Sequence, residues 1–143
     1  MMNEFKDYFR RFALIFSIMA LIAAVHIFRL GSYFEGWMYT LYYSYFSDFI
    51  IPFGCYFLLC NSGPYVPVLN RWEVKFAIMF LLPSIAETCQ YFGIPVLGVT
   101  FDPLDYVMYA AGALSAVVVD TQVFARVFKF WAREVAGSHR VNR

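Results

Sequence analysis

Charged residues are scarce in this sequence of 143 residues, of which only 15% are Asp, Glu, Lys or Arg. A soluble domain carries about 25%. The net charge is +1, which excludes both a basic surplus for binding nucleic acid and the acidic excess of a solvated tail. Cysteine is also rare. Cys55, Cys60 and Cys89 have neither a C-x-x-C spacing nor the even number of a disulfide framework, so we interpret them as small buried apolar residues.

The sequence is instead rich in apolar and aromatic side chains, at 62% and 22% of the residues. This exceeds what the core of one soluble domain needs, so part of it must face lipid. We therefore predict a single integral membrane domain covering residues 1–143. Lys6, Arg10 and Arg11 precede the first apolar run as in a signal peptide, but no small-x-small cleavage site follows, and we expect this run to be retained as a helix.

The apolar runs predict an all-α fold, a bundle of four transmembrane helices. Each run is close to the roughly 20 residues that cross a hydrocarbon core of about 30 Å. The expected helices cover approximately residues 12–29, 40–60, 74–92 and 103–128. Between the first two, the aromatic stretch from Gly31 to Tyr45 predicts an interfacial segment, because Tyr and Trp favour the headgroup level. Asp48 and the Pro52 and Gly54 pair are expected to interrupt the second helix.

Basic residues gather in three parts of the chain. Ten of the eleven Lys and Arg residues lie at the N-terminus, in the middle loop and at the C-terminal end: Lys6, Arg10, Arg11, Arg71, Lys75, Arg126, Lys129, Arg133, Arg140 and Arg143. With four spans, the positive-inside rule puts both termini in the cytoplasm. The alternative has three spans, with the segment from Thr40 to Cys60 entering the membrane and returning on the same side.

Two carboxyl groups fall inside the predicted spans at similar depth. Asp48 lies eight residues after Thr40 and Glu87 six residues before Gly93, about 12 and 9 Å below the outer helix ends at 1.5 Å per residue. An acid at membrane depth costs about 3 kcal/mol or more unless it is paired, protonated or hydrated, so we take Asp48 and Glu87 as candidate catalytic acid and base. The alternative is that both acids are protonated, or are hydrogen-bonded to Tyr, Ser or backbone groups, and join helices.

Four further residues are candidate ligand-binding groups around the same outward-facing pocket. Gln90 shares a helix face with Glu87, and His26 lies near the outer end of the first helix. Asp102 and Asp105 precede the last helix, where an N-cap, a proline at the first position and an acid in the first turn would explain both acids without function. A hydrogen-bonded interfacial anchor would likewise explain His26. No ligand spacing supports a metal site, and no cofactor is predicted.

The last predicted helix carries a further acid and many small residues. Asp120 lies toward its cytoplasmic end, where an ion pair with Arg126 or a bond to a neighbouring helix would account for it. Small residues let helix backbones approach closely in lipid. They are Ala110, Ala111, Gly112, Ala113, Ser115 and Ala116.

Three stretches together resemble the VanZ-like family of small membrane proteins. The stretch from Ser47 to Gly54 is similar to a polar residue followed by the family's apolar-Pro-apolar-Gly helix. The stretch from Glu87 to Gln90 is similar to its E-x-x-Q motif. The stretch from Thr100 to Asp105, with Gly112 seven residues later, is similar to the acidic loop before its last helix.

The chain departs from the family pattern at three places. Asp48 and Tyr109 stand where the family usually has asparagine, and Val99 and Thr100 stand where it has a basic residue. Losing that basic residue weakens any inherited role in binding an anionic headgroup.

The resemblance implies a cell-envelope setting, the bacterial cytoplasmic membrane, and a role in resistance to lipoglycopeptide antibiotics such as teicoplanin. The expected partners are the lipid bilayer and an envelope lipid or glycopeptide-like ligand, with no nucleic acid. Whether the chain is an enzyme stays open, because no nucleophile is evident. Two alternatives are an accessory subunit of a larger membrane complex, contacting it through the aromatic segment, and a proton-coupled carrier that uses Glu87.

Overall fold

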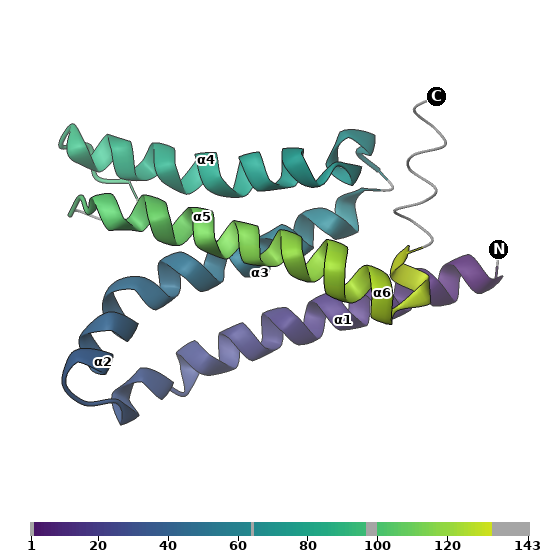
Figure 1. Ribbon diagram of the computed structural model, residues 1–143, viewed down its shortest axis with the longest axis horizontal. Coiled ribbons are helices and arrows are strands. Elements are labelled where there is room, and N and C mark those ends of the chain that lie inside the picture. The colour runs from purple at the N-terminus through teal and green to yellow at the C-terminus, as the bar shows by residue number, and fades with distance from the viewer. Residues whose placement is uncertain (1, 64, 97–99, 133–143) are drawn as a thin grey trace.

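The computed structural model describes residues 2–63, 65–96 and 100–132, and these parts of the chain are helical, with no strand. The long helices lie antiparallel, each reversing the direction of the one before it (Figure 1). The elements are α1 (Met2–Ile27), the 3-10 turn η1 (Leu30–Tyr33), α2 (Trp37–Leu41), the π-helical turn η2 (Tyr42–Phe46), α3 (Ser47–Ser62), the 3-10 turn η3 (Pro67–Asn70), α4 (Trp72–Tyr91), α5 (Pro103–Val118), the π-helical turn η4 (Val119–Phe124) and α6 (Ala125–Val127). A further helical turn covers residues 129–132.

Three helical stretches of the described chain are long and apolar enough to cross a membrane, as an integral membrane protein requires. They are Phe5–Ile27, Trp37–Ser62 and Pro103–Val127. α4 has 20 residues, about 30 Å at 1.5 Å per residue, but Lys75, Glu87 and other polar residues make it less apolar. It nevertheless lies alongside α5 over its length (Figure 1).

The first helix is longer at its start than the apolar pattern predicted. It begins at Met2 because nothing between the basic segment and the apolar run breaks a helix, and Lys and Arg are good helix formers. It ends at Ile27, two residues before Arg29 adopts a left-handed backbone with φ of 50°. The exposed aromatics of the predicted interfacial segment follow, among them Tyr33 and Trp37.

The second apolar run is one continuous helical stretch of 26 residues, formed by α2, η2 and α3. The expected interruption at Asp48, Pro52 and Gly54 is wrong, because α3 continues through all three residues. The stretch also does not turn back on itself, as the re-entrant alternative required. The π-helical turn η2 before Asp48 adds a residue to one turn, a feature that often occurs at functional sites.

α3 is the central helix of the fold. It packs on α5, α4 and α1, and its most extensive contact is with α5. Gly112 of α5 makes this contact close, since a Cβ there would collide with the backbone carbonyl of Phe49. Tyr56 and Phe57 of α3 are fully buried, whereas α1 leaves most of its large apolar side chains exposed, as a helix in contact with lipid would.

A buried polar cluster joins the helices at the end where α1 begins and α6 ends. Asp120 of η4 accepts hydrogen bonds from Lys75 Nζ at 2.8 Å, Tyr56 OH at 2.8 Å and Trp131 Nε1 at 2.7 Å. Of the two expectations for Asp120, the bond to a neighbouring helix is confirmed and the pairing with Arg126 is wrong. Arg126 instead donates to Gln122 at 2.6 Å, one turn earlier on the exposed surface.

Arg11 adds a second cation to this cluster. Its Nη2 donates to the carbonyl oxygen of Cys60 at 2.7 Å, and its guanidinium lies 4.8 Å from the centre of the Trp131 ring. The cluster therefore joins α1, α3, α4, η4 and the turn at residues 129–132.

Candidate functional site

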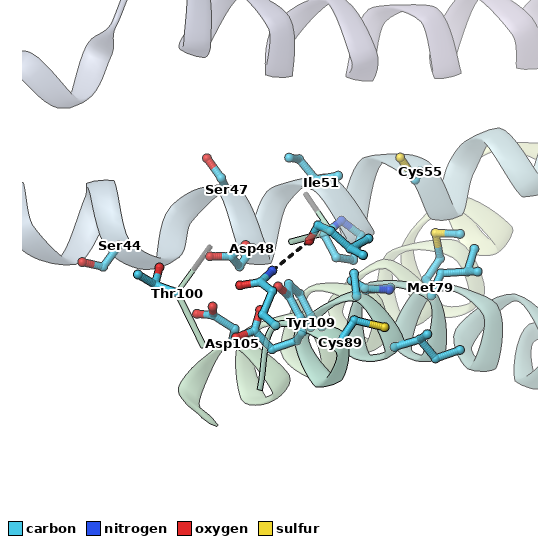
Figure 2. A pocket seen from close by; sticks show the side chains of 18 residues that line it. Ser44, Ser47, Asp48, Ile51, Cys55, Met79, Cys89, Thr100, Asp105 and Tyr109 are labelled. Carbon is cyan, nitrogen blue, oxygen red and sulfur yellow. Dashed lines mark hydrogen bonds between the residues drawn. The ribbon is translucent and has the colours of Figure 1, made fainter. Parts of the chain in front are cut away.

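A cavity of about 980 Å³ lies between α3 and α4, and α5 forms its third wall. It exists because α3 and α4 each pack more extensively on α5 than on one another. Figure 2 shows Asp48, Asp105 and Tyr109 together in one part of the cavity, with Cys55 and Met79 toward the other. Eighteen residues line it: Ser44, Ser47, Asp48, Ile51, Pro52, Cys55, Met79, Leu82, Pro83, Ile85, Ala86, Glu87, Cys89, Gln90, Val96, Thr100, Asp105 and Tyr109.

The two candidate acid and base residues both line this cavity, from opposite walls. Glu87 of α4 is only 2% exposed, and its Oε1 accepts a hydrogen bond from the backbone N–H of Asp102 at 2.7 Å. Asp48 lies on α3. The Tyr109 side chain of α5 lies between them, within hydrogen-bonding reach of both carboxyl groups. The phenol hydroxyl can donate a hydrogen bond to either carboxylate or to a bound polar group.

Asp105 brings a third carboxyl group into the cavity, from the first turn of α5. Asp48, Glu87 and Asp105 thus share one cavity, where any two that are ionised would repel one another. No Lys, Arg or His is among the residues that line the cavity in the described part of the chain. The site is therefore acidic, and a positive charge or a set of hydrogen-bond donors would relieve the repulsion.

Gln90 also lines the cavity, one turn after Glu87 on the same face of α4. Its Nε2 donates to the carbonyl oxygen of Val96 at 3.0 Å, which ties the segment after α4 back to the helix. Gln90 thus shapes the end of the cavity next to the C-terminal end of α4.

Asp102 is not a lining residue, but it supports the site. It is the N-cap of α5, as the sequence predicted: its Oδ1 accepts from the backbone N–H of Leu104 at 2.9 Å, and Pro103 follows at the first helical position. Its Oδ2 accepts from Tyr45 OH at 3.2 Å. Because its own N–H binds Glu87, the start of α5 fixes the position of that carboxyl group.

Replacing Asp102 by alanine is expected to lower the free energy of unfolding by about 1 kcal/mol, the usual cost of a lost N-cap. Asparagine at the same position keeps a capping oxygen and should preserve stability. Unfolding of both variants in mixed detergent, followed by circular dichroism, measures this. If the asparagine variant is as unstable as the alanine variant, the charge of Asp102 matters more than its capping bond.

His26 does not line the cavity. Its Nδ1 pairs with the carbonyl oxygen of Ile22 at 2.9 Å and its Nε2 with Ser47 Oγ at 3.2 Å. Ser47 does line the cavity, so His26 reaches the site only through that hydroxyl. Among the residues that the structure describes, no three metal-ligating side chains come together.

The sequence pattern does not single out several of the lining residues, above all Tyr109, which stands where the resembling family usually has asparagine. Its spacing of four residues from Asp105 on one helix face is a signal that would have found it. No spacing in the sequence would have predicted Ser44 or Thr100. Their positions at the cavity depend on η2 and on the segment before α5.

The site thus combines three carboxyl groups, a phenol and an apolar extension in one cavity. Comparisons of the chain with protein-family models, with curated proteins and with solved structures find no match.

Proposed function

We propose that this chain is a VanZ-like protein of the bacterial cytoplasmic membrane. Its outward-facing acidic pocket binds a cell-envelope lipid or a glycopeptide-like ligand. If the chain is an enzyme, the same pocket modifies that ligand. The observation that carries it is the convergence of Asp48, Glu87 and Asp105 on one cavity of about 980 Å³. Glu87 is buried and Asp48 and Asp105 are partly buried around an open space. This is costly for a purely structural role, whereas a ligand that binds the acids would compensate.

The arrangement of the family-like stretches supports the proposal. The stretch from Ser47 to Gly54 lies on α3, the stretch from Glu87 to Gln90 on α4, and the stretch from Thr100 to Asp105 leads into α5. Each contributes residues to the cavity. Stretches far apart in the sequence that supply one cavity are more readily explained by a common ligand than by three separate packing roles.

The topology that we propose has four spans, with α4 as the third, and both termini in the cytoplasm. In support, the basic residues at the start of α1, at the start of α4 and on α6 belong to one end of the helices. The cavity acids belong to the other end. By the positive-inside rule the basic end is cytoplasmic, so the cavity would open toward the outer half of the membrane.

Replacing Glu87 by Gln and Asp48 by Asn, separately, tests this function. Each change removes a charge but little volume, so we expect both variants to fold in detergent and to lose glycopeptide tolerance in cells. The matched control is Glu73→Gln, since Glu73 lies on α4 as well but is half exposed at the opposite end. Folded variants with unchanged tolerance would contradict the proposal, and loss of folding in both would assign the acids to structure.

A further inference from the structure

The cavity has a polar end and an apolar end at different depths along α4. Glu87 lies four residues before Tyr91, the last residue of α4, which is about 6 Å at 1.5 Å per residue. Leu82 lies nine residues before Tyr91, about 14 Å by the same rise. Cys55 and Met79 lie on the side of the cavity away from Asp48 in Figure 2. A ligand that fits this shape has a polar head near the outer surface and an apolar chain toward the bilayer middle.

Exposed apolar side chains on α3 and α4 border the cavity. Ile51 of α3 is 52% exposed, and Leu82 and Ile85 of α4 are 60% and 58% exposed. Leu82 is at the depth where a hydrocarbon core of about 30 Å has its middle. In a bilayer these three residues would face acyl chains, so the opening between α3 and α4 leads into lipid.

The charges of the lining residues restrict which polar head groups a ligand of this cavity can carry. Asp48, Glu87 and Asp105 share the cavity and would repel one another where they are ionised, and no basic residue is among the described lining residues. A phosphate head would add to this repulsion, whereas an ammonium group would relieve it and can donate three hydrogen bonds. Tyr109, between two of the acids, supplies a further polar contact.

We infer that the ligand is an amphiphile with a positively charged amine, which enters from the bilayer between α3 and α4. Its amine binds at the three carboxyl groups, and its apolar chain lies along Ile51, Cys55 and Met79. The cavity volume of about 980 Å³ accommodates a ligand of that class. The inference rests on the proposed pocket and goes beyond it by naming the charge of the ligand and its route of entry.

Cys55 provides a direct probe, because it lines the apolar end of the cavity and is partly accessible, whereas Cys60 is buried. The purified chain in nanodiscs is treated with an N-alkyl maleimide, and labelling of each cysteine is followed by peptide mass spectrometry. Dodecylamine is expected to slow labelling of Cys55 by about tenfold once its concentration exceeds the dissociation constant about ninefold. Dodecyl phosphate at the same membrane concentration is expected to leave the rate unchanged.

Variants test whether the protection of Cys55 by dodecylamine depends on the carboxyl groups. The double variant Asp48→Asn, Asp105→Asn should be labelled at Cys55 as fast as the parent chain, but dodecylamine should no longer protect it. Glu73→Gln, with its change at the opposite end of α4, should keep full protection.

The possible outcomes separate this inference from the proposed function. Equal protection by dodecylamine and dodecyl phosphate overturns the amine assignment and leaves the pocket as an amphiphile site. Protection by teicoplanin alone overturns the inference and keeps the proposed function. No protection of a labelled Cys55 by any of the three compounds overturns both, and no labelling of Cys55 in the free protein overturns entry from the bilayer.

Discussion

Replacing Asp120 by asparagine is expected to lower the free energy of unfolding by about 3–5 kcal/mol, the cost of removing one partner from a buried ion pair. Asp120 supplies the negative charge of the cluster at the basic end, where Lys75 Nζ lies 2.8 Å from its Oδ2. Without that charge, Lys75 would stay buried without its counter-ion. Unfolding in mixtures of mild detergent and dodecyl sulfate, followed by circular dichroism, measures the loss.

The contacts of this cluster also predict how the stability losses of its variants compare with one another. Lys75→Met should cost less, about 1–3 kcal/mol, because Asp120 keeps its hydrogen bonds from Tyr56 and Trp131. Glu73→Gln is the control, since its ion pair with Arg71 is exposed and worth at most about 1 kcal/mol. A Lys75 variant that is less stable than the Asp120 variant would contradict the view that Asp120 organises the cluster.

Replacing Gly112 by alanine is expected to destabilise the chain by about 1–3 kcal/mol through overpacking. The added Cβ would meet the carbonyl group of Phe49, which is backbone and cannot move aside without shifting α3. Because Asp48 precedes Phe49 and Tyr109 lies one turn before Gly112, the shift would also widen the site. We therefore expect loss of stability in the unfolding assay together with loss of glycopeptide tolerance.

Gly54→Ala is the matched control for this change. A Cβ at Gly54 would meet the ends of the Ile22 and Met19 side chains, which can adopt other rotamers. Moving these side chains costs energy, but the gain in helix propensity from glycine to alanine, about 0.5–1 kcal/mol, offsets part of it, so the net cost should be below about 1 kcal/mol. If both alanine variants are equally unstable, the close approach of Gly112 to Phe49 is not what holds α3 and α5 together.

The Asp120 cluster and Gly112 lie at different levels along the same helices. The cluster of Asp120 holds α3, α4 and η4 together at the basic end, and Gly112 holds α3 against α5 next to the acids. α3 and α4 pack less extensively on one another than either packs on α5, and the cavity lies between them. The cavity thus opens between α3 and α4 at the end of the helices that carries the acidic side chains.

The sequence by itself determined the helical class of the chain, the approximate limits of its four long helical stretches and the capping role of Asp102. These properties depend on local patterns: apolar runs of sufficient length, glycine and proline in turns, and an acid before a proline at a helix start. Similar depth along two helices also put Asp48 and Glu87 forward as a pair, because the rise per residue is fixed.

Only the tertiary structure decided which side chains meet. Tyr109 lies between Asp48 and Glu87, and His26 lies outside the cavity, because helix rotation and the π-helical turn η2 set the face that each residue presents. The Asp120 cluster combines residues from five parts of the chain, and no local spacing encodes that combination. Depth in the membrane follows from counting along one helix, whereas a contact depends on how several helices pack, which no single helix specifies.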